Sequence, residues 1–128
     1  MRKVILWAVA GVLVAGASMA DPALGLWKTE VDDGAYAHVQ ISPCGANVCG
    51  TIVQSFNEEG EYASPNMGKQ IVREMSPTGG GAYEGEVWRP SNDKIYIGKM
   101  QVNGTKLTLK GCVAGGLFCA SQQWSKVN

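Results

Sequence analysis

Short runs of alternating apolar and polar residues, separated by turn-forming residues, fill the chain after residue 20. In residues 36–42, for example, Ala37, Val39 and Ile41 lie at every second position. A period of two is typical of a strand with one buried face, and no apolar stretch after residue 20 has helical spacing over a helix-like length. The pattern predicts an all-β protein with eight strands, at residues 26–30, 36–42, 50–56, 69–74, 83–88, 94–102, 106–113 and 121–127.

The connections between these strands are short and sequential, and Asn103-Gly104 is the strongest hairpin signal among them because both residues tolerate positive φ. Such connections favour an eight-stranded up-and-down antiparallel barrel with short hairpin loops, which closes on itself and leaves no exposed edge. Eight strands enclose an interior that is either just filled by side chains or holds one small ligand.

The longest irregular stretch is residues 57–68, where Tyr62 and Met67 are the only large apolar side chains. In a barrel this stretch would lie over one mouth. A loop of this length is either functional or simply solvated, and the sequence leaves both interpretations open.

The first 20 residues have the pattern of a secretory signal peptide. Arg2 and Lys3 precede an apolar run at 4–17, and Ser18 and Ala20 occupy the small positions before a cleavage point at Asp21. The run is shorter than the ~20 residues that cross a bilayer, so a stable membrane span after cleavage is not expected. The sequence predicts a signal peptide at 1–20, a barrel domain at 21–128, and a periplasmic or secreted protein.

Removing residues 1–20 from the 128-residue chain leaves 108 residues, the size of a single domain. The loss of Arg2 and Lys3 reduces the basic residues from 11 to 9 against 11 acidic ones, a net charge of −2. This near-neutral, slightly acidic composition lacks the basic stripe that nucleic-acid binding requires.

Four cysteines, an even number, lie after the leader: Cys44, Cys49, Cys112 and Cys119. In a small exported protein this indicates two disulfides. Pairing within each hairpin, Cys44 with Cys49 and Cys112 with Cys119, is favoured, although cross pairing is left open. A metal site is not expected, because zinc spacing is lacking and His38 is the only histidine.

Catalytic residues are not evident. Glu84 and Glu86 alternate onto one face of a strand, as paired carboxylates would, but strands commonly place two charges toward solvent. His38 has no neighbouring serine or free cysteine as a nucleophile, and Asp32-Asp33-Gly34 indicates a turn. We therefore expect neither an enzyme nor a cofactor.

Binding of a small, mostly apolar molecule in the barrel is the favoured function, because such pockets are lined by apolar and aromatic side chains with a few polar groups. The alternative is a protein-interaction or structural module of the cell envelope, or a homodimer, whose interior is filled by the same side chains. The candidate ligand-binding residues are Trp27, Val39, Ile52, Val72, Trp88, Tyr96, Met100, Leu109 and Trp124.

Several segments carry a family resemblance. They are residues 25–30 (Gly-Leu-Trp-Lys-Thr-Glu), 41–45 (Ile-Ser-Pro-Cys-Gly), 48–53, 111–113 and the closing 121–127 (Ser-Gln-Gln-Trp-Ser-Lys-Val). Together they resemble the exported bacterial family catalogued as domain of unknown function 2147. The resemblance covers essentially the whole chain after the leader and implies a lipocalin-like, calycin-type barrel, but it implies no activity.

In lipocalin-like barrels a basic residue on the last strand packs over a tryptophan on the first strand. The resemblance therefore implies that Trp27 and Lys126 close the barrel. The chain departs from the pattern by placing a lysine where an arginine is expected, and an ammonium stacks less well on an indole than a planar guanidinium does. The long C-terminal helix of full-size lipocalins is also not expected here.

Overall fold

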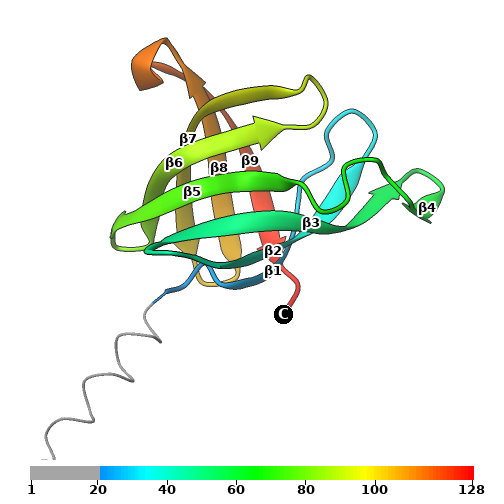
Figure 1. The fold of residues 1–128 in the computed structure, drawn as a ribbon, viewed down its shortest axis with the longest axis horizontal. Helices are drawn as coiled ribbons and strands as arrows, with labels where there is room; N and C mark the ends of the chain where they lie inside the picture. Colours follow the sequence, from blue (N-terminus) through cyan, green and yellow to red (C-terminus); the bar gives the residue numbers. More distant parts are fainter. Residues whose placement is uncertain (1–20) are drawn as a thin grey trace, which may run out of the picture.

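A computed structural model describes residues 21–128, which form a single antiparallel sheet closed into a barrel (Figure 1). Strand β1 pairs with both β2 and β9, and β2 also pairs with β3, so the first and last strands meet and the sheet has no break. The elements are β1 (Gly25–Lys28), β2 (Tyr36–Cys44), β3 (Asn47–Asn57), β4 (Gly60–Tyr62), β5 (Gln70–Gly79), β6 (Ala82–Arg89), β7 (Lys94–Asn103), β8 (Lys106–Val113), the 3₁₀ turn η2 (Ala114–Gly116) and β9 (Phe118–Lys126).

The predicted fold class is confirmed. Strand β4 pairs only with β3, so the barrel itself has eight strands, and each corresponds to one predicted from the alternating pattern. The short β4 lies inside the stretch 57–68 that was predicted to be irregular, because Asn57 and Gly60 pair and form a tight hairpin there.

One predicted strand is too short. The strand predicted at residues 69–74 continues to Gly79 as β5, and Pro77 pairs with Tyr83. The register shifts on either side of Pro77, between Arg73 and Ser76 and between Pro77 and Gly79. Such irregular positions tolerate a residue that cannot donate a backbone hydrogen bond.

One end of the barrel is sealed by the residues that precede β1. The indole Nε1 of Trp27 donates to the backbone oxygen of Ala23 at 2.8 Å, and the Tyr83 hydroxyl donates to the carboxylate of Asp21. The pKa of Tyr83 is raised well above its ordinary value of 10, mainly by burial and secondly by the contact with Asp21. The hydroxyl therefore keeps its proton. Residues 21–24 therefore form a lid that is held by side chains of two strands.

Glycines on inward-facing positions let side chains of the facing strands meet at this end. A Cβ atom at Gly98 would lie 2.7 Å from Met75 Cε and 2.7 Å from Val87 Cγ2, so those two side chains already fill the space in front of it. A Cβ at Gly50 would lie 2.9 Å from Val39. These close contacts fill the interior of the barrel around Gly50 and Gly98.

The two predicted disulfides are confirmed, and both have the local pairing. Cys44–Cys49 lies at the β2–β3 turn of the closed end, and Cys112–Cys119 lies at the base of η2, near the opposite end. Within residues 21–128 the structure contains no helix that is long and apolar enough to cross a membrane. The predicted signal peptide, residues 1–20, lies outside the described residues.

Candidate functional site

A cavity of about 640 Å³ occupies the half of the barrel opposite the closed end. It opens between the β1–β2, β4–β5 and β6–β7 connections, which lie on the upper right side of Figure 1. Its wall comes from loop residues at the mouth and from inward-facing strand residues deeper down. The lining residues include Thr29, Ile52, Ser55, Ser64, Ile71, Val87, Leu109, Gln122 and Trp124.

The inner wall of the cavity is apolar. Ile52, Ile71, Val87 and Leu109 are all buried, and Trp124 is only 1% exposed. The Trp124 Nε1 donates to Gln122 Oε1 at 2.9 Å, and this hydrogen bond holds the indole in place. Gln122 also lines the cavity. The wall thus offers an aromatic and aliphatic surface on which the indole N–H of Trp124 is already satisfied.

Three hydroxyl groups are set into this wall. Thr29, Ser55 and Ser64 are the buried polar side chains among residues 21–128, and all three line the cavity. Thr29 Oγ1 accepts from the backbone N–H of Ala37 at 3.0 Å, and Ser64 Oγ accepts from the backbone N–H of Asn66 at 3.0 Å. A hydroxyl that accepts in this way still has its own proton to donate. The cavity therefore presents O–H donors from two different strand connections.

An ion pair braces the mouth. Arg89, the last residue of β6, donates through Nε and Nη2 to the two carboxylate oxygens of Asp32, both at 2.9 Å, and Ser91 Oγ donates to the same carboxylate at 3.2 Å. This bidentate geometry joins the β1–β2 loop to the end of β6 and holds two sides of the rim together. Because the charge of Arg89 is matched by Asp32, the unpaired charges at the mouth are the carboxylates of Glu30 and Asp33.

The hydrogen bond from Arg89 holds the pKa of Asp32 below its ordinary value of 3.8, and partial burial opposes this only in part. A carboxyl whose pKa is depressed by folding stabilises the fold above the unfolded value, and this stabilisation is lost as the pH falls through the lower, folded value. We expect an NMR titration of Asp32 to give a pKa below 3.8, and Arg89→Gln to return it toward 3.8. Ser91→Ala should move it much less, and an Asp32 carboxyl that titrates at or above 3.8 in the unsubstituted protein would contradict this assignment.

The candidate ligand-binding residues divide between the two halves of the barrel. Five of the nine line the cavity: Ile52, Trp88, Tyr96, Leu109 and Trp124. The other four are buried in the filled half, away from the cavity: Trp27, Val39, Val72 and Met100. Alternation identifies the face of a strand but not the depth along the barrel axis, so the two groups look alike in sequence.

Trp88 lies at the rim rather than at the centre of the wall. Its Nε1 donates to Asp93 Oδ1 at 2.8 Å, and the ammonium of Lys69 lies 5.5 Å from the ring centroid. Its neighbour Val87 pairs with Tyr96 and points inward, where its Cγ2 would lie 2.7 Å from a Cβ at Gly98. The sequence alone does not decide between these two residues, because both are apolar and both are buried.

The seam between the first and last strands contains the pair implied by the family resemblance. Trp27 is opposite Lys126, whose Nζ lies 4.9 Å from the indole centroid and donates to the backbone oxygen of Leu24 at 2.8 Å. A Cβ at Gly25 would lie 2.9 Å from this Nζ, and Gly25 has a φ of 131°, so a glycine is needed where the lysine crosses. The seam belongs to the closed half and not to the cavity.

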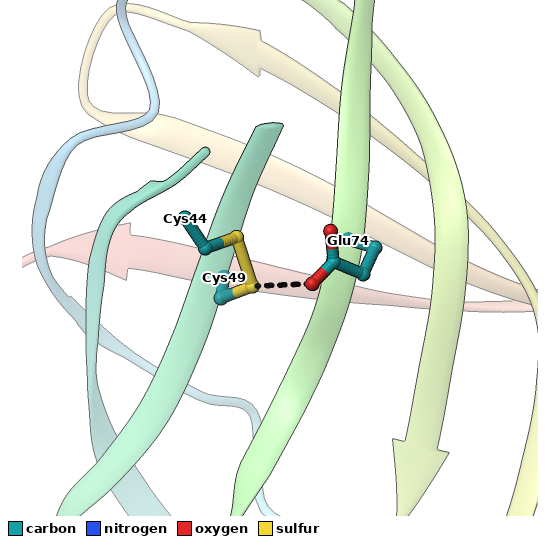
Figure 2. Close-up of side chains that lie close together, drawn as sticks. All are labelled: Cys44, Cys49 and Glu74. Carbon is teal, nitrogen blue, oxygen red and sulfur yellow. Dashed lines mark hydrogen bonds between the residues drawn. A yellow bond between two sulfur atoms is a disulfide. The ribbon is translucent and has the colours of Figure 1, made fainter. Parts of the chain in front are cut away.

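One cluster has the residue types of a metal site but not the chemistry. Figure 2 shows Glu74 beside the Cys44–Cys49 disulfide, with Glu74 Oε2 3.8 Å from Cys49 Sγ. Disulfide sulfurs are neither thiolates nor proton donors, so they offer a cation little, and the second oxygen of Glu74 accepts from Asn47 Nδ2 at 3.1 Å. We interpret the cluster as a contact that fixes the β2–β3 turn against β5.

The other charged candidates lie on the outer surface. Glu84 and Glu86 are exposed on β6, and Glu86 faces Arg73 at 3.4 Å. His38 Nδ1 is hydrogen-bonded to Gln54 Oε1 at 3.0 Å. Neither the two glutamates nor His38 lines the cavity.

The sequence interpretation missed the three buried hydroxyls and the Asp32–Arg89 pair. Strict alternation from Ile52 would turn Gln54 inward and Ser55 outward, but the register shifts between His38 and Val39, and Ser55 faces Ala37 inside the barrel. Asp32 looked like an ordinary turn residue because its partner lies 57 positions away. In the sequence, the one signal of a buried hydroxyl is the break in apolar alternation after Ile52, which is followed by Ser55.

Comparisons with known proteins identify a family and a similar fold. The profile of a family described as "Uncharacterized protein conserved in bacteria (DUF2147)" matches residues 25–126. Among solved structures, a protein from Helicobacter pylori described as belonging to the lipocalin family, HP1028, is similar with a TM-score of 0.67, 12% sequence identity and 82% of each chain covered. No curated protein matches the chain. At this identity the structural similarity shows the barrel fold alone.

Proposed function

Because this chain belongs to the bacterial family DUF2147 and has a lipocalin-like barrel, we propose that it binds one small, mostly apolar molecule in its cavity. The observation that carries the proposal is the cavity itself. Its volume of about 640 Å³ lies inside the ~300–1,000 Å³ range of small-molecule sites, and its inner wall is apolar. A barrel whose interior only completes the core would be filled at both ends.

The lining also favours a particular chemistry of ligand. Thr29 and Ser64 offer hydroxyl donors to a carbonyl, ether or hydroxyl oxygen on an otherwise apolar body. Glu30 and Asp33 at the mouth repel an anionic end group, while Arg89 is already paired. The proposed ligand is therefore neutral or cationic, with an oxygen function that can accept from these hydroxyls. Residues 1–20 support the further proposal that the protein works after export, in the periplasm or outside the cell.

Fluorescence titration tests the proposal directly, using the neutral probe 1-aminoanthracene and the anionic probe anilinonaphthalene sulfonate. We expect the barrel, residues 21–128, to bind the neutral probe at least tenfold more tightly, with quenching of tryptophan emission because Trp124 lines the cavity. Ala120→Phe should weaken the neutral probe at least tenfold, since Ala120 lines the cavity and the added ring would occupy it.

The matched control adds the same ring to the outside of the barrel. Thr108 on β8 faces outward, where its hydroxyl donates to Gln123 Oε1, so Thr108→Phe should change the affinity less than twofold. Native mass spectrometry of the purified protein adds a second measurement, in which a co-purifying small molecule supports the proposal. No probe binding together with no co-purifying molecule would overturn it and favour an interaction or structural module.

A further inference from the structure

Charge is divided sharply along this chain. All 11 acidic residues precede residue 94, and residues 94–128 contain no aspartate or glutamate. The same segment forms β7, β8, η2 and β9, which are neighbours in the sheet. Its five charged residues are all lysines: Lys94, Lys99, Lys106, Lys110 and Lys126. The charged side chains of these strands are therefore all basic, although the protein as a whole is nearly neutral and the Glu30 carboxylate accepts a hydrogen bond from the backbone N–H of Gln123 on β9 at 2.8 Å.

The same side also exposes apolar side chains. At the η2 turn, Leu117 is 75% exposed, Phe118 is 64% exposed and Val113 is half exposed, and on β7 Ile95 and Ile97 point outward. In Figure 1 this turn, drawn in orange, projects beyond the rest of the barrel. Exposed apolar groups gathered on one protruding turn indicate a contact surface rather than scattered surface residues.

The lysines lie close behind this apolar tip. Lys99 and Lys110 face each other across β7 and β8, and the Lys99 Nζ lies 3.6 Å from the point where a Cβ of Gly116 would be. The Cys112–Cys119 disulfide joins β8 and β9 at the base of the turn, which limits how far the tip can deform. The result is a stiff apolar tip with ammonium groups beside and below it.

We propose that this tip, Val113 with Leu117 and Phe118, inserts into the interface of a membrane that contains anionic lipids, with Lys99 and Lys110 at the level of the phosphates. Apolar side chains that enter the interface and lysines that bind anionic head groups are the two components of reversible membrane attachment. Lysine stems can lie along the apolar surface while their ammonium groups reach the phosphates. This inference goes beyond ligand binding in the cavity and does not rest on it.

The distribution of acidic groups favours a tilted orientation on the membrane. The β1–β2 loop with Asp33 and the β3–β4 hairpin with Glu58 and Glu59 belong to the same open end but to other sides of the rim. Repulsion from anionic lipids keeps these loops away from the surface while the η2 turn touches it. A small protruding tip suits a lipid interface better than a protein partner, because stable protein interfaces bury a broad surface.

Co-sedimentation with vesicles tests the proposal on residues 21–128, which contain the whole barrel and exclude the apolar leader. We expect the protein to sediment with vesicles of equal parts phosphatidylglycerol and phosphatidylcholine at least tenfold more than with phosphatidylcholine alone. Raising the salt from 50 to 500 mM should remove most of this difference, because salt screens exposed charges.

Matched variants separate the tip from the rest of the surface. Leu117→Asp should lower binding to the mixed vesicles at least tenfold, whereas Val53→Asp, an exposed apolar residue on β3, should lower it less than threefold. The double variant Lys99→Gln/Lys110→Gln should lower binding about fivefold or more, against less than twofold for Lys106→Gln at the closed end. Circular dichroism and probe binding should be unchanged in Leu117→Asp, which shows that the barrel and its cavity are intact.

Three results would overturn the proposal. They are a protein that stays in the supernatant with both kinds of vesicle at 50 mM salt, equal binding to both kinds, and equal loss for Leu117→Asp and Val53→Asp. The first of these, with neutral-probe binding intact, would leave the cavity proposal standing and assign the tip to a protein partner. Vesicle binding without any probe binding would support the membrane proposal and count against the cavity proposal. The two proposals therefore fail independently.

Discussion

Replacing Trp27 by alanine should lower the free energy of unfolding by roughly 3–5 kcal/mol, the usual cost of truncating a fully buried aromatic side chain. Trp27 is completely buried, and three features of the closed end depend on it: the hydrogen bond to Ala23, the stacked Lys126 and the packing beneath residues 21–24. Urea denaturation followed by circular dichroism measures the change. In thermal denaturation the same change should appear as a fall in the melting temperature of roughly 10–20 °C for a domain of this size.

Two further variants divide this effect into its parts. Trp27→Phe keeps a ring in the core but removes the N–H that binds Ala23, so it should cost about 1–2 kcal/mol. Lys126→Met keeps the stem over the indole and removes the charge, which should cost about 0.5–1 kcal/mol. A Trp27→Ala protein that lost less than 1 kcal/mol of stability would show that the closed end is held mainly by other contacts.

Removing both disulfides should lower the free energy of unfolding by roughly 4–5 kcal/mol. The bridges close loops of 6 and 8 residues, and the chain-entropy estimate gives each about 2–2.5 kcal/mol. They lie near opposite ends of the barrel and share no partner, so their effects should add. Denaturation of the protein with and without a reducing agent measures the sum, and the variants Cys44→Ala/Cys49→Ala and Cys112→Ala/Cys119→Ala measure the parts.

The four-alanine variant is the control for this experiment. It should match the reduced protein in stability, and the reducing agent should no longer affect it. Complete reduction, established by thiol titration, with a loss below 1 kcal/mol would show that the hairpins are already held as tightly by their backbone ladders.

Most of the fold can be predicted from the strand pattern. Ala37, Val39 and Ile41 mark an inward face by alternation, and the turn at Asn103-Gly104 marks a hairpin, because both features depend on neighbours in the sequence. The path of β5 through Pro77 does not follow from the sequence in this way. It depends on register shifts against β6, and these are set by contacts between separate strands.

The cavity follows from the sequence much less well. Val39 and Ile52 are opposite each other on β2 and β3, are both apolar and both face inward, yet only Ile52 lines the cavity. The difference is depth along the barrel axis, which depends on how the lid of residues 21–24 and the glycines at 50 and 98 fill one end. Those contacts join distant parts of the chain, so local periodicity contains no information about them.

The division of charge has a consequence at longer range than any contact. The side formed by β7, β8 and β9 carries net positive charge, and the remaining strands carry net negative charge. The molecule therefore has a permanent electric dipole across the barrel. A charged surface exerts a torque on such a dipole within about one screening length, roughly 10 Å at 0.1 M salt. A barrel that approaches an anionic surface is therefore turned before it touches, so that the η2 turn arrives first and collisions are productive more often than random orientation allows.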